Sequence, residues 1–129
     1  MSYKTLLAYQ KAFDLAMKIF KVTKGFPKEE LFGLTGQMRR SSRSVCSNLA
    51  EGYRKRKYEA HFVSKVTDAD MENSETQVWL DFAFACEYIT AEQYKDFYAE
   101  TEEIGRLLFY MAGNPAKFCS QPKNHDLNR

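Results

Sequence analysis

The stretch LTGQMRRSSRSVCSNLAEGY, residues 34–53, decides the fold because it separates apolar from basic side chains at helical spacing. Met38, Val45 and Leu49 recur at steps of seven and four residues, so they share one face of a helix. Adjacent serines lie beside that face and permit another helix to approach closely. The stretch therefore predicts an amphipathic helix with one side in a core and its arginines on the other.

The residues before this stretch predict another amphipathic helix, over residues 5–24. Gly25-Phe26-Pro27 ends it, because glycine and proline interrupt helical periodicity. Its apolar face is predicted to consist of Tyr9, Phe13, Ala16 and Phe20.

Two helices are predicted after the stretch. Residues 58–89 contain no proline or glycine and form the longest predicted helix. Thr90 and Gln93 have the spacing of a capping box, which starts the next helix, and Gly113-Asn114-Pro115 stops it. No segment alternates with period two for long enough to predict a strand. The fold class is therefore all-α, an antiparallel up-down four-helix bundle.

The composition fits one globular domain: of 129 residues, 44% are hydrophobic and 28% charged. The bundle is assigned to residues 5–113, and residues 114–129 are predicted to be a flexible tail. No apolar run approaches the roughly 18 residues of a membrane span, and no secretory signal is recognisable. Three cysteines without CxxC spacing argue against a disulfide framework or zinc site and favour reduced thiols in the cytoplasm.

The net charge of +2 conceals a division between the two halves of the chain. Residues 1–57 carry 13 Lys and Arg against 4 Asp and Glu, whereas residues 58–129 carry 6 against 13. This asymmetry indicates a polyanion partner, or one half binding the other within or between chains.

The basic half is organised around the predicted helix over residues 34–53. Arg40, Arg43 and Arg54 fall within about 60° of one another on a helical wheel, opposite the core stripe. Three interpretations stay open: a surface for nucleic-acid phosphates, a surface that pairs with an acidic neighbour, and a solvated face. Tyr53 and Tyr58 beside the run either stack on bases or serve packing and capping. The candidate nucleic-acid-binding residues are Arg39, Arg40, Arg43, Arg54, Lys55, Arg56 and Lys57.

The predicted helix over residues 58–89 is apolar on two sides. Leu80 and Ala83 continue its core stripe, but Val78, Phe82 and Ile89 do not. Because a surface helix of a monomeric bundle needs one apolar stripe, these three residues are candidates for a homo-oligomer interface. The alternative is a thick aromatic core at one end of the bundle. Polar Asn73 and Thr76 sit on the core stripe and could fix its register.

No catalytic constellation or cofactor site is apparent, and we expect a non-enzymatic protein. Glu72-x-x-Glu75 has the spacing of a di-iron ligand pair but lacks the histidine, so solvated acids explain it better. Cys46 or Cys86 with His61 could form a nucleophilic pair, but a small buried cysteine in a helix is more common.

The chain closely resembles the four helix bundle protein family, the 23S rRNA intervening-sequence proteins, also labelled the S23 ribosomal protein family. The resemblance covers about residues 5–112, and its most specific part runs from Asn48 to Gly52. Arg43 departs from the family pattern, in which a small apolar residue is common. The matching motifs are Gln10-Lys11-Ala12, Phe26-Pro27, residues 32–42, Val45, residues 48–52 and Glu75-Thr76.

The resemblance implies a bundle fold and a ring-shaped homopentamer. It also implies kinship with accessory proteins of diversity-generating retroelements, which bind nucleic acid and a reverse transcriptase. Together with the basic helix, it predicts an oligomeric protein that binds nucleic acid, and structured RNA in particular, through phosphates with little base specificity. The alternative is a scaffold whose basic face docks an acidic protein or a neighbouring subunit.

Overall fold

The computed structural model describes residues 2–119 and contains four long helices joined by short connections. Short 3-10 turns precede the first helix, join the first two and follow the last, at Tyr3–Thr5 (η1), Lys28–Glu30 (η2) and Pro115–Lys117 (η3). The long helices are α1 (Leu7–Thr23), α2 (Leu34–Arg54), α3 (Glu59–Ala85) and α4 (Ala91–Gly113).

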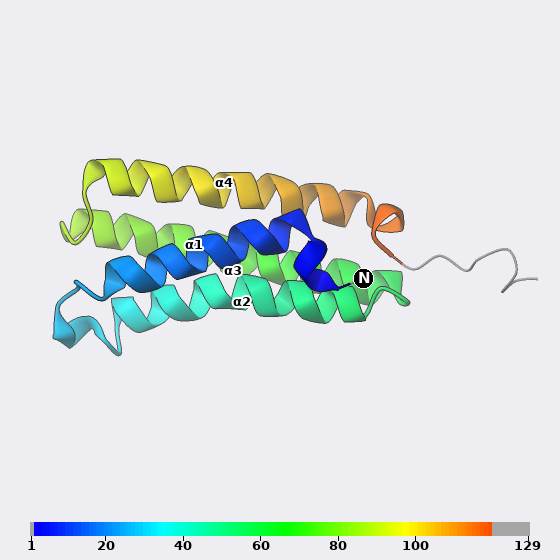
Figure 1. The fold of residues 1–129 in the computed structure, drawn as a ribbon, viewed down its shortest axis with the longest axis horizontal. Coiled ribbons are helices and arrows are strands. Elements are labelled where there is room, and N and C mark those ends of the chain that lie inside the picture. The colour runs from blue at the N-terminus through cyan, green and yellow to red at the C-terminus, as the bar shows by residue number, and fades with distance from the viewer. Residues whose placement is uncertain (1, 120–129) are drawn as a thin grey trace, which may run out of the picture.

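Successive helices run in opposite directions, so the chain is the predicted antiparallel up-down bundle (Figure 1). Each helix packs against two neighbours, and α1 closes the bundle by packing on both α2 and α4. The diagonal pairs, α1 with α3 and α2 with α4, bring no Cα atoms within 8 Å of one another among the described residues.

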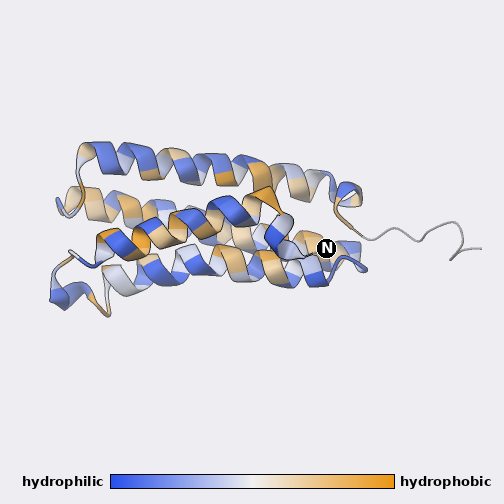
Figure 2. Ribbon diagram, in the orientation of Figure 1, coloured by the Kyte–Doolittle hydropathy of each residue, from blue (hydrophilic) through white to orange (hydrophobic). Residues whose placement is uncertain are grey.

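The core runs along the bundle axis and takes one stripe from each helix. Met38, Val45 and Leu49 of α2 are each at most 2% exposed, as their spacing predicts. Leu80 and Ala83 of α3 are fully buried. Hydrophilic and hydrophobic residues alternate along each ribbon, as expected for helices with one buried face (Figure 2).

The buried face of α1 agrees with the prediction at Ala16, which is 7% exposed, but differs at the other three residues. Ala8, Ala12, Leu15 and Ile19 form the core stripe, whereas Phe13 is 48% exposed. The small alanines let α1 approach its neighbours closely, and that approach leaves no room for large rings between the helices. Tyr9, Phe13 and Phe20 therefore lie at the edge of the core, not within it.

Small residues bring α2 and α3 together. The hydroxyl groups of Ser41 and Thr76 are 2.8 Å apart in a buried hydrogen bond. A Cβ atom on Gly52 would lie 3.0 Å from Cβ of Lys65, which is tighter than usual packing, so glycine favours this close approach. Buried polar contacts thus fix how these helices meet, as expected for Thr76.

A second buried polar contact joins α3 to α4. The side-chain amide of Asn73 donates a 2.8 Å hydrogen bond to the carbonyl of Thr101. Thr90 and Gln93 form the predicted capping box at the start of α4, with both reciprocal hydrogen bonds present. Capping satisfies backbone donors that the first turn of a helix leaves unpaired.

The end of α3 was predicted at residue 89 but lies at Ala85. The amide of Tyr88 donates to the carbonyl of Ala83, and the amide of Glu87 donates to that of Phe84. This pair of bonds is a Schellman motif, which needs a left-handed residue after the helix. Glu87 occupies that position with φ of 61°. Glycine usually occupies the left-handed position of this motif. Because glutamate occupies it here, the sequence did not predict that the helix ends at this point.

Replacing Glu87 with glycine should stabilise the protein. Glycine adopts the left-handed conformation without the steric cost that a Cβ atom imposes. After allowance for the greater freedom of glycine in the unfolded chain, we expect the free energy of unfolding to rise by about 0.5–1 kcal/mol. This free energy is measured by unfolding the protein in urea and monitoring the loss of helix by circular dichroism. Glu87→Ala is the control: it removes the same charge but keeps Cβ, and an equal gain in that variant would contradict the backbone explanation.

Beyond α4 the described chain forms a short turn that packs against the bundle. Residues 115–117 of the predicted tail form η3, and the ring of Phe118 stacks on Phe62 with centroids 6.1 Å apart. Residues 120–129 of that tail lie outside the described residues.

Candidate nucleic-acid interface

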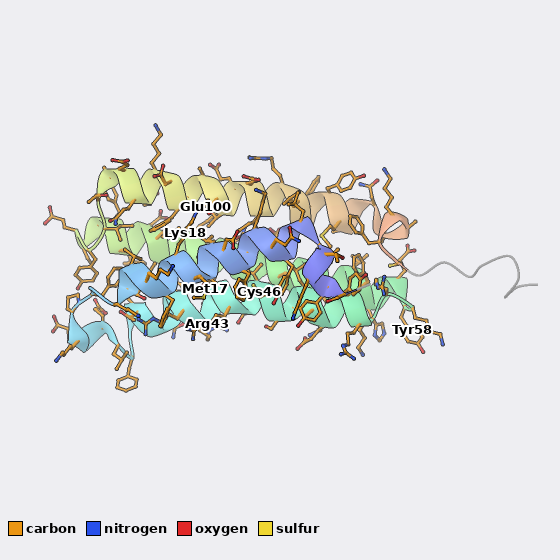
Figure 3. All side chains as sticks on the ribbon, viewed as in Figure 1. Met17, Lys18, Arg43, Cys46, Tyr58 and Glu100 are labelled. Carbon is orange, nitrogen blue, oxygen red and sulfur yellow. The ribbon has the colours of Figure 1, made fainter. Side chains whose placement is uncertain are left out.

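Much of the charge division is used inside one chain. Lys11 and Lys18 of α1 form ion pairs of 2.6 Å and 3.0 Å with Glu103 and Glu100 of α4. The second of these pairs lies between the two helices (Figure 3). Arg40 of α2 pairs with α3 in the same way. Basic residues of the first half therefore face acidic residues of the second half, which is one of the arrangements that the asymmetry predicted. The candidate interface is therefore sought among the seven predicted basic residues, in those whose side chains have no partner within the chain.

Arg39 is a structural residue of the α1–α2 contact. Its Nε donates a 2.9 Å hydrogen bond to Oγ1 of Thr23, and its Nη2 lies 3.5 Å from the carbonyl of Phe20. The guanidinium also lies over the ring of Phe20, 4.9 Å from its centroid. A cation at the last turn of α1 is favourable for the helix dipole. Arg39, which the sequence predicts to bind nucleic acid, therefore has its side chain in the contact between α1 and α2.

Arg40 is occupied by two carboxylates of α3. Its Nη2 lies 2.9 Å from Oε1 of Glu72 and 3.0 Å from Oε1 of Glu75. The hydrogen bonds that Arg40 donates to Glu72 and then to Glu75 raise the pKa of Arg40. Burial alone would raise the pKa of Glu75, but hydrogen bonds from Arg40 and Trp79 outweigh it and lower that pKa. An external phosphate would have to compete with both carboxylates for Arg40.

Arg56 is folded back on the end of α2. Its Nε donates a 2.8 Å hydrogen bond to the carbonyl of Tyr53, and its guanidinium lies 3.6 Å from the centroid of the Tyr53 ring. Tyr53 itself is 7% exposed and packs in the core. Tyr58, which starts α3, is 57% exposed. Of the two tyrosines considered for stacking, only Tyr58 presents its ring to solvent.

The remaining four predicted residues form what we call the free basic surface: Arg43, Arg54, Lys55 and Lys57. All four are exposed, and none forms an ion pair with any residue between 2 and 119. Arg43 lies over the ring of Phe20 at 5.6 Å, a contact that leaves its charge uncompensated. The surface extends from the middle of α2 into the α2–α3 turn.

A crevice of about 410 Å³ adjoins this surface where α1 and α2 run side by side. Met17 of α1 and Cys46 and Arg43 of α2 lie along it (Figure 3). The aromatic residues that α1 excludes from the core form much of its wall. The full lining is Tyr3, Tyr9, Phe13, Ala16, Met17, Arg43, Cys46, Ser47 and Ala50.

Cys46 lies in the wall of the crevice and should react slowly with alkylating reagents. The residue is 9% exposed, and burial raises the pKa of its thiol from 9.0 to about 11. The thiolate is the nucleophilic form, so alkylation at about pH 8 should be about 100-fold slower than in the urea-unfolded chain. Mass spectrometry after iodoacetamide treatment measures both rates. Cys86, which is exposed just beyond α3 and not buried as expected, is the internal control. Equal rates at the two cysteines of the folded protein would contradict burial of Cys46.

The same shift in pKa sets a direction for stability at high pH. Above pH 9 the unfolded chain loses the Cys46 proton, whereas the folded chain keeps it until about pH 11. The unfolded state then binds fewer protons, so the free energy of unfolding falls as the pH rises through this window. Cys46→Ser should make that decline smaller.

The outer face of α3 carries two of the three predicted interface residues. Val78 is 47% exposed and Phe82 is 54% exposed, and Met71 on the same face is 71% exposed. The prediction that Ile89 belongs to this interface is wrong. The residue lies beyond the end of α3 and is buried in the core, with 5% of its surface exposed. The Schellman motif turns the chain at Glu87, which places Ile89 on a different side from Val78 and Phe82.

Neither a metal centre nor a membrane-spanning helix emerges from the described part of the chain. Residues 2–119 contain no group of three or more His, Cys, Asp or Glu side chains arranged to hold a metal ion. None of the helices there combines the length and apolar character that crossing a bilayer requires. His61 is exposed and its ring lies 5.7 Å from that of Tyr58.

The geometry defines the class of the protein: it is a four-helix bundle whose second helix carries the free basic surface. The chain belongs to the 23S rRNA-intervening sequence protein family, whose model matches residues 4–110. No curated protein matches the chain in sequence. A crystal structure of a protein of unknown function from the S23 ribosomal protein family of Bacteroides thetaiotaomicron has a similar fold, with a TM-score of 0.74. The two sequences are 29% identical, and the match covers 83% of this chain and 96% of the other.

Proposed function

We propose that this protein is a non-enzymatic nucleic-acid-binding protein that holds RNA by its phosphates on the free basic surface. The observation that carries the proposal is the distribution of ion pairs. Lys11 and Lys18 of α1 and Arg40 of α2 have carboxylate partners, whereas Arg43, Arg54, Lys55 and Lys57 have none among residues 2–119. Exposed cations without partners can exchange their counterions for phosphates, which is the main source of affinity in such complexes.

The part of the free basic surface that lies on α2 has a fixed geometry for phosphate contact. Arg43 and Arg54 lie on one helix, eleven residues and thus roughly 16 Å apart. Arg39 fixes α2 to α1, and Gly52 allows α3 to lie close behind the same segment. The family's name refers to an intervening sequence of 23S rRNA, which makes RNA the first polyanion to test.

Fluorescence anisotropy with a labelled single-stranded RNA tests the proposal. We expect binding at low salt that weakens steeply as salt is added, because phosphate contacts release counterions. Absence of binding at low salt would overturn the proposal.

We also propose that the protein is a homo-oligomer assembled through the outer face of α3. Val78 and Phe82 are about half exposed on a helix whose other apolar stripe is already buried, and such a surface is typical of a protein contact. Five subunits are the number that the family resemblance implies. The alternative prediction is that the basic surface docks an acidic protein or a neighbouring subunit. A reverse transcriptase is a further partner that the family resemblance implies.

We also propose the cytoplasm as the location, because the three cysteines are free thiols, which is usual for proteins of a reducing compartment.

A further inference from the structure

The crevice between α1 and α2 has a wall of unusual composition. Tyr9 and Phe13 stack with ring centroids 6.1 Å apart, and Tyr3 meets Tyr9 edge to face at 4.9 Å. Phe13 and Met17 are 48% and 40% exposed, so their apolar surfaces face solvent in the isolated chain. The volume of about 410 Å³ lies within the roughly 300–1,000 Å³ that small-molecule sites occupy.

The lining of the crevice contains one charged residue, Arg43, and no acidic residue. Because α1 and α2 are antiparallel, Arg43 lies near Met17 at one end, and the α2 wall continues through Ser47 and Ala50 towards Arg54. Arg43 of the free basic surface thus lies at one end of the crevice. Arg54 of the same surface lies beyond the opposite end. An occupant that suits this arrangement has a flat or apolar body and negative charges on both sides.

We infer that the crevice binds an unpaired base of single-stranded RNA while the free basic surface holds the flanking phosphates. The inference rests on the proposed function and makes it more specific, because a base in a duplex is stacked on its neighbours and cannot enter the crevice. Aromatic rings bind unpaired bases by stacking irrespective of sequence. The hydroxyl groups of Tyr9 and Ser47 provide polar atoms for the edge of the base. An apolar side chain of a second copy would leave Arg43 without an anionic partner, so charge favours the nucleotide.

A short single-stranded RNA containing 2-aminopurine, and the duplex of the same sequence, test this inference on the full chain. The single strand should bind more tightly than the duplex, and the fluorescence of the base analogue should fall as it stacks. Phe13→Ala should weaken single-strand binding by about 5- to 100-fold, the loss expected for one stacked base, and leave duplex binding unchanged. Phe13 is half exposed, so its removal should preserve the fold.

Two further variants sharpen the comparison. Phe13→Leu keeps an apolar side chain but removes the ring, so it should weaken single-strand binding almost as much as alanine does. Phe109→Ala removes a ring that is 80% exposed on α4, away from the crevice, and should change nothing.

The outcomes separate this inference from the proposed function. Equal binding of single strand and duplex, with no effect of Phe13→Ala, would overturn the base site. The phosphate surface would still stand if removal of its cations weakened both complexes. A smaller assembly in light scattering for Phe13→Ala, with unchanged RNA affinity, would show that the crevice is a protein contact. Absence of any RNA binding by the unmodified protein would overturn both.

Discussion

Replacing Arg43, Arg54, Lys55 and Lys57 with glutamine should nearly abolish RNA binding. Each phosphate contact on a single strand contributes about 0.7 to the slope of log affinity against log salt concentration. Loss of four contacts should therefore lower the affinity by roughly 1,000-fold at about 50 mM salt. All four side chains are exposed, so the variant should fold normally, which circular dichroism can verify. Fluorescence anisotropy gives the affinity.

The matched control removes the same number of positive charges elsewhere. Lys11, Lys18 and Lys65 form ion pairs within the chain, and Lys95 lies on α4, away from the free basic surface. Replacing these four lysines with glutamine should lower the affinity by less than tenfold, through net charge alone. If both quadruple variants lost affinity equally, binding would depend on total charge and no particular surface would be involved.

Phe82→Asp should dissociate the oligomer without unfolding the subunit. Phe82 is 54% exposed on α3, so an aspartate is solvated there in the free chain but loses its hydration when another subunit covers it. We expect the dissociation constant of the assembly to rise by at least about 100-fold, because a buried unpaired charge is costly. Light scattering at micromolar concentration should then give 15.0 kDa for the variant and a multiple of that mass for the unmodified protein.

Phe109→Asp is the matched control for this experiment. It places the same charge at a residue that is 80% exposed on α4, and it should leave the assembly intact. A mass of 15.0 kDa for the unmodified protein would contradict the oligomer proposal. So would an unchanged mass for Phe82→Asp.

Helical periodicity predicted the fold but not which apolar residues of α1 enter the core. The number of helices, their order and the core stripe of α2 follow from spacing, because one buried face on each helix satisfies a bundle. On α1, Ala8 and Ala12 compete with Tyr9 and Phe13 for the interior. Hydrophobicity alone favours the larger rings, whereas the observed packing depends on how closely α1 approaches its neighbours. That distance is set by residues of other helices, so it cannot be read from α1.

The candidate site could be predicted as a region but not residue by residue. Seven basic residues cluster in the sequence from Arg39 to Lys57, and all of them lie on α2 or the α2–α3 turn. Their partners come from distant parts of the chain: Thr23 for Arg39, and Glu72 for Arg40. Spacing along one helix does not show which cations a neighbouring helix neutralises. Of the seven residues, Arg43, Arg54, Lys55 and Lys57 are the four whose side chains form neither an ion pair nor a hydrogen bond within residues 2–119.

The measurement that tests the central claim most directly is the salt dependence of single-stranded RNA affinity. Four phosphate contacts predict a linear plot of log affinity against log salt concentration with a slope of about −3. The variant that lacks the charges of Arg43, Arg54, Lys55 and Lys57 should bring that slope close to zero. A slope near zero for the unmodified protein, or the same slope in the variant, would contradict the claim that these four residues bind phosphates.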